Sequence, residues 1–522
     1  YERCREEAQR LWADGARRDQ VGYYLGKIGS ERLRDDVVGS VLYLGPASAA
    51  GAPFAKEALS SLALALGKLG RGPEALKTWE LWLARYGDGP PIENAKKRFR
   101  EDVTPEPAPL KLLVEAHYDR ARLLHQLGRS KEAARDLEAF LTAHKQGFDV
   151  GKYRWFVGFW RYRAGMYKAA IASMRRLTGS QNPLVGGKAR YWTGRALEGL
   201  KQPAEAIEVY AGLATGMPLT YYGALAERRL VALGQEARLP EVVDGSKRRG
   251  SSVTLETVPD SPEVRRLRVA AHLGEPDTAR AVLDAVRPAL SRQLGAAKLA
   301  TLEESLADPL ESYASRRAEA RSKYAKELKT APTAETLKAW RAVYPRAYAT
   351  HVVAGAKASG FPEWLIYSHM LQESRFKPWM ISGAPAFGLL ELLDRTARRL
   401  AAERGDDYQR WQLLEPRWNV RWGAQYLGAL ASKFDGRLPL ASASYNGGPR
   451  LLVALLDRAG DVPFDVFVDD MPTHETRNYL RKVIEHALRY AAVWDTPKRA
   501  RALRDRLLRD DWRGKVFPEP DY

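Results

Sequence analysis

A short pattern, a turn residue followed by alanine, recurs through the first half of the chain. The turn residues are Gly70, Gly128, Gly165, Lys201 and Gly274, and an alanine follows each of them two to five positions later. Their spacings are 58, 37, 36 and 73 residues, the last being close to twice the two before it. Each copy predicts two helices joined by a tight turn, with the small alanine letting them approach closely. Such hairpins must stack, because only a neighbour covers each apolar face.

The residues between these turns also favour helix. Apolar side chains recur at i, i+3, i+4 and i+7, and no Val/Ile/Thr-rich alternation argues for a sheet. The repeat period is slightly longer than the roughly 34 residues of tetratricopeptide hairpins, which it resembles. We therefore expect a mainly α protein that begins with a superhelix of tetratricopeptide-like helical hairpins. Generic packing of an α-helical bundle is the alternative.

Two changes in composition predict domain boundaries. Residues 241–262 are polar and rich in Gly, Ser and Pro, and aromatic residues, Gly and Pro become denser after Tyr344. We expect an α-superhelical repeat domain over 1–240 and a linker with a second helical block over 241–340. A domain carrying the chemical motifs should follow over 341–495, and a C-terminal helix and tail over 496–522.

Charge and cysteine content restrict the class of protein. The 83 Lys and Arg residues exceed the 64 Asp and Glu residues by 19 in this 522-residue chain, which favours a polyanionic partner. Basic residues alternate with acidic ones, so no nucleic-acid-binding stripe is expected. A single cysteine, Cys4, excludes a disulfide framework. The sequence has no run of about 18 apolar residues, so no transmembrane segment is predicted. We expect any signal peptide to have been removed or omitted.

Several kinds of chemistry lack their motifs. The segment from His474 to Asn478 begins like a zinc-binding helix but has no second histidine four positions on. His369 and Glu373 are four residues apart, yet no third ligand lies nearby, so no metal is expected. Neither a phosphate-binding glycine loop nor a GxSxG nucleophile motif occurs, and no cofactor is expected.

Four segments of the last third remain as candidates for chemistry: 361–378, 381–397, 443–449 and 471–480. In the first, Glu373 lies near the C-terminal end of an amphipathic helix expected to begin after Pro362. A carboxyl there loses solvation and its pKa rises, which suits a general acid for glycoside cleavage. In the third, Tyr445 and Asn446 form a polar turn expected at a cleft edge. The alternative for Glu373 is a structural ion pair with a nearby arginine.

In this order, the four segments resemble the catalytic domain of the soluble lytic transglycosylases, which has a goose-lysozyme-like fold. That family carries the patterns E-S-x-F-x-P, S-x-A-G-A-x-G-L-M-Q-L, A-Y-N-A-G-P and P-x-x-E-T-R-x-Y. The resemblance covers about residues 344–495, and the helical repeats resemble the superhelical part of the larger members. It implies a lysozyme-like, α-rich catalytic domain after the superhelix.

The resemblance also implies a reaction and its residues. Glu373 falls on the catalytic acid, which protonates the β-1,4 bond between N-acetylmuramic acid and N-acetylglucosamine and then acts as base. The product is a 1,6-anhydro sugar, formed without water. Tyr445 would support the catalytic carboxyl, and Gly388 with Leu389 would form a tight helix start lining the cleft. The implied substrate-binding residues are Ser382, Gly388, Leu389, Glu391, Leu393, Tyr445, Asn446 and Glu475.

Departures from the family pattern leave two alternatives open. Glu391 stands where the family has Gln, so a like charge would raise the pKa of Glu373 further. A second carboxylate also permits a muramidase that hydrolyses the same bond with Glu373 and Glu391. Leu393, Asp394 and Pro385 alter the groove, which permits a catalytically inactive glycan-binding scaffold.

The family resemblance gives the basic surface a partner and the chain a location. Peptidoglycan strands carry carboxylates, so we expect them to bind a cationic protein. A periplasmic location follows from such a substrate. The superhelix is expected either to frame the glycan or to recruit a protein partner.

Overall fold

The computed structural model is helical almost throughout the part of the chain it describes. The described residues are 2–14, 18–27, 37–49, 52–87, 108–236, 255–272, 276–308, 310–383 and 385–517. They divide into two compact units, Tyr1–Val209 and Tyr210–Tyr522. The predicted boundary at residue 240 lies outside the described residues.

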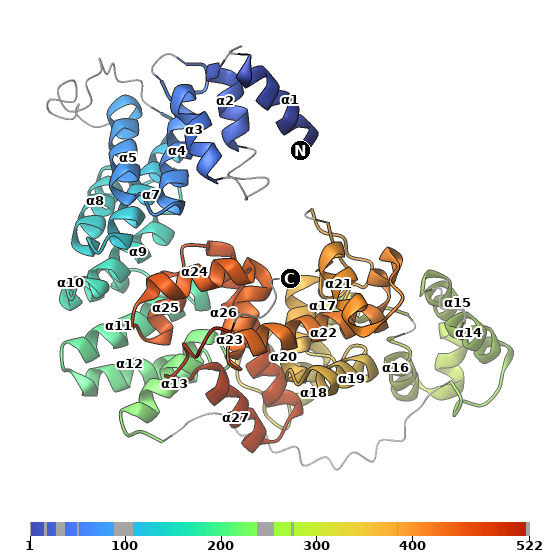
Figure 1. Ribbon diagram of the computed structural model, residues 1–522. Coiled ribbons are helices and arrows are strands. Elements are labelled where there is room, and N and C mark those ends of the chain that lie inside the picture. Colours follow the sequence, from blue (N-terminus) through green and yellow to red (C-terminus); the bar gives the residue numbers. More distant parts are fainter. Residues whose placement is uncertain are drawn as a thin grey trace. The chain divides into compact units, whose positions relative to one another are not determined.

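Helices up to residue 216 are labelled in Figure 1 where space allows. They are α1 (Glu2–Ala13), α2 (Arg18–Lys27), α3 (Val37–Ala47), α4 (Ala55–Lys68), α5 (Gly72–Tyr86), α7 (Leu110–Gln126), α8 (Ser130–Ala143), α9 (Val150–Arg163), α10 (Tyr167–Arg175), the π-helical turn η2 (Pro183–Gly187), α11 (Lys188–Gly199) and α12 (Pro203–Gly216). The boundary between the two units falls within α12.

The second unit continues with helices and one very short hairpin. Its elements are α13 (Tyr221–Ala232), α14 (Pro262–His272), α15 (Pro276–Leu294), α16 (Ala296–Ser305), α17 (Tyr313–Lys323), η3 (Glu327–Lys329), α18 (Leu337–Val343), α19 (Ala349–Ser359), α20 (Glu363–Glu373), β1 (Ala386–Phe387), β2 (Leu392–Leu393), α21 (Asp394–Arg404), η4 (Arg410–Leu414), α22 (Pro416–Lys433), α23 (Leu438–Gly447), α24 (Pro449–Ala459), α25 (Phe464–Asp470), α26 (His474–Trp494) and α27 (Pro497–Leu507).

The predicted turns lie between consecutive helices, which confirms the helical hairpins. Gly70, Gly128, Gly165 and Lys201 have φ angles of 77°, 79°, 72° and 59°. At each, the amide of the next residue donates to the carbonyl oxygen five residues before it, at 2.9–3.0 Å. This is the Schellman geometry that ends a helix at a left-handed residue. Gly274 lies outside the described residues.

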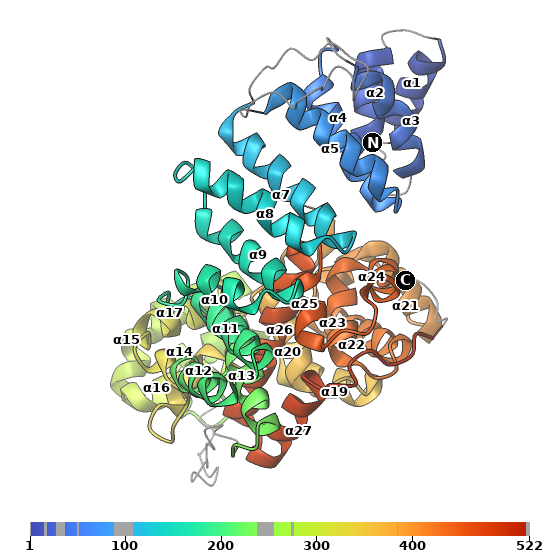
Figure 2. The same cartoon turned by 90° about the vertical axis from the view of Figure 1, so that its left-hand side faces the viewer.

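The alanine after each turn lies in the helix–helix contact. Five positions after the five predicted turn residues, the side chains are at most 1% exposed, and these are Ala75, Ala133, Ala170, Ala206 and Ala279. Within the first unit each helix packs mainly on its neighbour in the chain, and Figure 2 shows α7 to α11 in succession. The expected solenoid of stacked hairpins is therefore confirmed.

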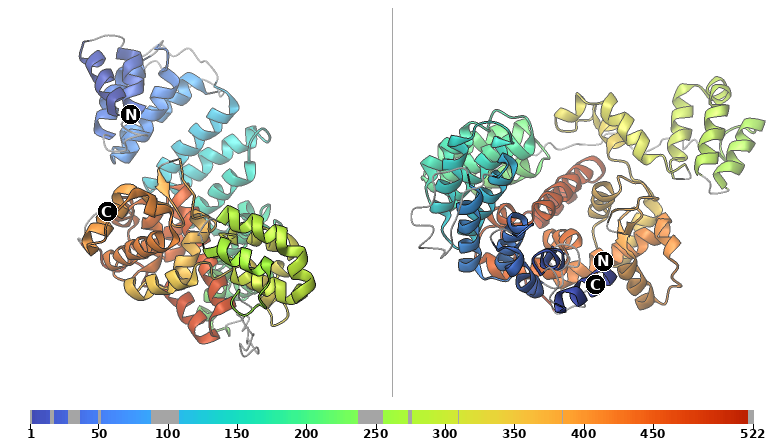
Figure 3. Two further views of the ribbon diagram at one scale, coloured as in Figure 1. Left: turned by 90° about the vertical axis from the view of Figure 1, so that its right-hand side faces the viewer. Right: turned by 90° about the horizontal axis from the view of Figure 1, so that it is seen from above.

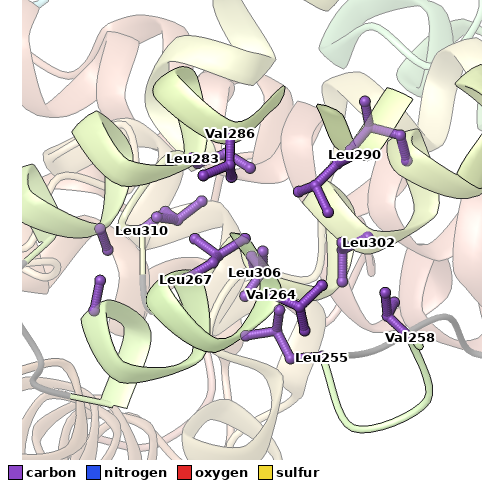
Figure 4. Close-up of a cluster of buried hydrophobic side chains, with 13 residues drawn as sticks. Leu255, Val258, Val264, Leu267, Leu283, Val286, Leu290, Leu302, Leu306 and Leu310 are labelled. Atoms are coloured by element: carbon purple, nitrogen blue, oxygen red, sulfur yellow. The ribbon is translucent and has the colours of Figure 1, made fainter. Parts of the chain in front are cut away.

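Helices α14, α15 and α16 enclose an apolar core of their own. Leucine and valine side chains from the three helices and from residues 255–258 point toward one another (Figure 4). The light green ribbon of Figure 3 shows α14 and α15 together as one group. These helices lie within residues 241–340, for which the sequence predicts a linker and a second helical block.

Helix α13 packs against α26 within the second unit. The Tyr222 hydroxyl donates to Asp469 at 2.9 Å, and the Arg481 guanidinium of α26 also binds that carboxylate. Glu227 accepts from Arg504 of α27 at 3.0 Å. These charged groups are buried, and buried ion pairs are strongly destabilising to break. They fix α26, which carries part of the candidate site.

Helix α20 is the central helix of this region, and it packs on α26. The expected start after Pro362 is confirmed. The expectation that the helix is amphipathic is wrong, because every residue from Trp364 to Leu371 is buried. Tyr367 and Tyr490 stack with ring centroids 5.2 Å apart. An all-round buried helix positions its last residue rigidly.

Residues 386–393 form an antiparallel hairpin, with Ala386 opposite Leu393. The expected helix start at Gly388 and Leu389 is therefore wrong, since α21 begins only at Asp394. Gly388 has φ 77° and Glu391 has φ 45°, both in the left-handed region that ends regular helices. A Cβ at Gly388 would lie 2.1 Å from a backbone oxygen, so only glycine fits this turn.

Among the described residues, no helix combines the length and apolar character needed to span a membrane.

Candidate active site

Glu373 is the last residue of α20, and the chain turns sharply after it. Arg375 and Phe376 have φ angles of 55° and 66°, which prevents the helix from continuing. The buried Ser374 hydroxyl donates to the Leu389 carbonyl oxygen at 2.8 Å. The end of α20 is thereby tied to the hairpin turn, and the Glu373 carboxyl lies at this junction.

Burial raises the pKa of Glu373 to about 8. The negative charges of Glu391 and Glu475 act in the same direction, whereas a hydrogen bond from Tyr479 favours the carboxylate and lowers it. Within the described ranges no ion pair reaches Glu373, so the alternative of a structural pair with arginine is not seen. The carboxyl is protonated at neutral pH, as the sequence argument expected.

Tyr479 is the hydrogen-bond partner of this carboxyl. Its hydroxyl donates to Glu373 Oε1 at 2.5 Å. The Tyr479 hydroxyl oxygen also lies 2.7 Å from His369 Nδ1, and His369 Nε2 lies 3.1 Å from Ser442 Oγ. His369 and Ser442 are both fully buried. Four side chains from α20, α23 and α26 thus form one hydrogen-bonded chain.

Glu391 lies in the hairpin turn and is half-buried. Burial raises its pKa as well. Its charge acts on Glu373, which agrees with the like-charge effect expected from the departure at this position.

Tyr445 is close to the acid but is not hydrogen-bonded to it. Its hydroxyl donates to the Leu390 carbonyl oxygen at 2.6 Å, and its ring meets the His369 ring edge-on at 5.0 Å. The expected polar turn is the last turn of α23, since the helix includes Asn446 and ends at Gly447. Tyr445 supports the site through the hairpin backbone, not through the carboxyl.

Asn446 and Glu475 form a second small cluster. The Asn446 amide donates to Glu475 at 3.4 Å and accepts from the Thr476 hydroxyl at 3.0 Å. Glu475 is exposed, in the first turn of α26. Tyr479 lies one helical turn further along α26, so α26 contributes both to this cluster and to the hydrogen bond on the Glu373 carboxyl.

The remaining predicted residues belong to the hairpin segment. Ser382 pairs with Ala386 through its amide at 3.0 Å. Leu393 is 38% exposed, whereas Leu389 is fully buried. The Leu389 side chain is therefore part of the core beneath the hairpin, and only its backbone serves the site.

Three contributors were not selected from the sequence. Asn419 of α22 binds Phe387 and Leu413 carbonyls and the Leu390 amide, each at 2.8 Å, and so holds the turn. Tyr479 lies in the fourth motif, and its spacing of four from Glu475 puts both on one face of α26. In the sequence His369 suggests only a metal ligand, although its spacing of four from Glu373 signals a shared face.

Comparison with known proteins places a domain on these residues. Residues 352–465 match the model of the transglycosylase SLT domain. The chain is 34% identical over 122 residues to the soluble lytic murein transglycosylase of Salmonella typhimurium, covering 23% of this chain and 19% of that protein. It is 31% identical over 174 residues to membrane-bound lytic murein transglycosylase C of Haemophilus ducreyi, covering 29% and 47%. The matches thus span less than half of each relative.

The fold extends beyond this segment. The structure of an inactive mutant of the lytic transglycosylase Slt from Pseudomonas aeruginosa superposes with a TM-score of 0.50 and 21% identity. The superposition covers 98% of this chain and 83% of that one. The architecture of a superhelix followed by a lysozyme-like domain is therefore shared.

Proposed function

We propose that this chain, which carries a transglycosylase SLT domain, is a lytic transglycosylase acting on peptidoglycan. It would cleave the β-1,4 bond between N-acetylmuramic acid and N-acetylglucosamine and leave 1,6-anhydro ends. Glu373 would serve as general acid and then as general base. The domain match over residues 352–465 and the matched relatives support this reaction.

The observation that carries the proposal is the burial of the Glu373 carboxyl at the end of α20, which raises its pKa to about 8. A carboxyl with its pKa near 8 is an acid at neutral pH, and a general acid works best when its pKa is near the working pH. The pKa is high because α20 is buried up to its last turn. The acid is thus prepared by the fold before any substrate arrives.

The two proton transfers balance on one carboxyl. Glu373 gives its proton to the glycosidic oxygen as the bond to C1 of the muramoyl residue breaks. The resulting carboxylate takes the proton of the muramoyl 6-hydroxyl while that oxygen bonds to C1. Glu373 is protonated again at the end, and no water is consumed. The nucleophile belongs to the substrate, so proximity replaces a protein nucleophile.

Tyr479 assists both halves of this cycle. Its bond to Oε1 stabilises the carboxylate formed after the first transfer. Glu373 makes no second hydrogen bond in the described part of the chain. We therefore assign the transferable proton to Oε2.

The substrate contacts are proposed from placement and chemistry. Polar groups of Ser382, Asn446 and Glu475 are at least partly accessible and suit sugar hydroxyls and acetamido groups. Leu393 offers an exposed apolar surface, while Gly388 and Tyr445 shape the turn that carries Glu391. Leu389 is omitted because its side chain is buried.

The hydrolytic alternative is less favoured. It needs Glu391 as a second, ionised carboxylate beside Glu373. The relatives over this segment are transglycosylases by name. An inactive scaffold would not need an acid kept protonated by burial at the junction of α20 and the hairpin.

A wall polymer also suits the surface of the protein. The excess of 19 basic residues favours carboxylate-bearing strands, and a periplasmic location would bring the protein to them. Binding to sacculi should weaken between low and high salt, because exposed charges are screened over about 10 Å at 0.1 M. Binding that is unchanged by salt would argue against this electrostatic contribution.

The test is digestion of purified sacculi by the parent protein, Glu373→Gln and Glu363→Gln. Glu363 begins the same helix, and burial raises its pKa too, but it pairs with Arg346 away from the site. The parent and the Glu363 variant should both clear a sacculus suspension. The Glu373 variant should be about 10²–10⁴-fold slower, the usual contribution of general acid–base catalysis. Equal clearance by all three would refute the assignment of Glu373.

A further inference from the structure

His369 is a buried titratable group that the proposed reaction does not use. It lies one helical turn before Glu373 on α20 and is fully buried. Burial lowers its pKa to about 3, so the ring is neutral at neutral pH. A neutral imidazole has one N–H and one bare nitrogen, and its neighbours decide which is which.

The hydrogen-bond chain fixes this choice. The Tyr479 oxygen has one hydrogen and gives it to Glu373 Oε1 at 2.5 Å. At 2.7 Å from that oxygen, His369 Nδ1 must therefore be the donor. Nε2 is then bare and accepts from the Ser442 hydroxyl at 3.1 Å. All donors point the same way, from Ser442 through His369 and Tyr479 to Glu373.

We propose that His369 is a positioning residue that holds the Tyr479 hydroxyl as a donor to Glu373 Oε1, and that Ser442 fixes the ring tautomer this requires. Without a donor at Nδ1, the Tyr479 hydroxyl could turn toward His369 and leave Oε1 without its partner. The inference rests on the proposed function only for the role of Glu373 as acid. The hydrogen bonds that link Ser442, His369, Tyr479 and Glu373 do not depend on whether the protein turns over substrate.

The donor-to-acceptor direction of these hydrogen bonds decides which oxygen of Glu373 carries the acidic proton. Oε1 accepts from Tyr479, so the proton of the neutral carboxyl occupies Oε2. A reversed chain would place the proton between Oε1 and Tyr479, where it cannot reach a glycosidic oxygen. His369 thus keeps the proton on the oxygen that is free to give it to substrate.

The hydrogen-bond chain also affects the pKa of Glu373. The groups that face this carboxyl are Tyr479 of α26, Glu475 of α26, Glu391 of the hairpin and Tyr445 of α23. Only Tyr479 donates a hydrogen bond to it, and that bond lowers its pKa. Weakening the bond therefore raises the pKa of Glu373 and moves the alkaline limit of activity to higher pH.

A matched pair of substitutions separates positioning from packing. In His369→Asn the side-chain N–H lies near the place of Nδ1, whereas in His369→Gln it lies near the place of Nε2. We expect His369→Asn to keep the alkaline limb of the pH–rate profile close to that of the parent. His369→Gln should move it upward by about 0.5–1 pH unit and lower kcat with little change in KM. Equal profiles for the two variants would overturn the proposal.

A double variant tests whether His369 acts through Tyr479. Once Tyr479→Phe has removed the hydroxyl, adding His369→Gln should cause no further shift of the limb. An additional shift would mean a separate route to Glu373 and would overturn the proposal. If the His369 variants do not fold, Ser442→Ala serves instead. It keeps the imidazole but frees its tautomer, and a limb unchanged in Ser442→Ala would overturn the role given to Ser442.

Two NMR measurements on the full chain do not depend on activity. The ¹⁵N shifts of His369 should show the neutral Nδ1–H tautomer from pH 5 to pH 9. The ¹³C titration of the Glu373 carboxyl should shift upward in His369→Gln and not in His369→Asn. A histidine that is Nε2–H, or that titrates near its usual range, would overturn the inference. Expected NMR results without glycan cleavage would instead overturn the proposed function alone.

Discussion

The Tyr479 hydroxyl donates a 2.5 Å hydrogen bond to Glu373 Oε1, although the two residues are 106 positions apart in the chain. Glu373 is the last residue of α20, and Tyr479 lies in the second turn of α26. Packing of these two helices therefore sets the geometry of the acid. When Glu373 loses its proton the bond becomes charge-assisted, and such a bond is about twice as strong as a neutral one.

Tyr479→Phe is expected to raise the pKa of Glu373, because the carboxylate loses the bond that stabilises it. The alkaline limb of sacculus digestion should move upward by about 1 pH unit. Tyr490→Phe is the matched control, since Tyr490 is also buried on α26 but donates to the Pro345 carbonyl oxygen at 3.0 Å. The prediction fails if both variants move the limb equally.

Glu373→Gln should stabilise the protein at alkaline pH. The folded-state pKa of Glu373, about 8, exceeds its ordinary value of 4.5, so the folded state binds the extra proton. The parent therefore loses stability as pH rises from about 4.5 through 8, and the amide does not. The variant's advantage in unfolding free energy should grow by roughly 2–4 kcal/mol between pH 5 and pH 8. Urea unfolding at both pH values measures it, and a constant difference would contradict the burial of the acid.

Glu391→Gln removes a like charge near Glu373 and restores the amide of the family pattern. The pKa of Glu373 should fall, and the alkaline limb of digestion should move downward by a few tenths of a pH unit. Release of soluble fragments at neutral pH should continue. Complete loss of cleavage in this variant would favour the hydrolytic mechanism with two carboxylates.

Gly388→Ala should destabilise the second unit by roughly 3 kcal/mol, because a side chain meets both an unfavourable φ and a crowded backbone. Its Cβ would lie 2.1 Å from the Leu413 carbonyl oxygen. Gly360→Ala is the matched control, with φ 69° but open space around the Cβ. It should cost only about 1–2 kcal/mol. Similar losses in denaturant unfolding would contradict the close contact at the turn.

Local chemistry made much of the fold predictable. A left-handed turn residue and a small residue five positions later are both local signals. The alanines that follow the predicted turn residues, from Ala75 to Ala279, are buried as expected. The start of α20 after Pro362 also follows from residues near each other in sequence. Local propensity was sufficient there.

Long-range contacts explain what was not predicted. The hairpin turn at Gly388 is held by Asn419 from α22, so its own sequence looks like a helix start. Tyr445 binds the Leu390 carbonyl instead of the acid, and Tyr479 takes the place expected for it. His369 gains its role only where α20, α23 and α26 meet. The spacing of residues along the sequence does not show that these three helices meet there.

The central claim concerns the fate of the glycosidic bond at Glu373. The most direct test is mass spectrometry of the soluble muropeptides that the parent protein releases from purified sacculi, with Glu373→Gln as control. Transglycosylation predicts fragments one water lighter than hydrolysis products, carrying 1,6-anhydro ends, and none from the control. Fragments with reducing ends would contradict the account, as would anhydro products from the Glu373 variant at the rate of the parent.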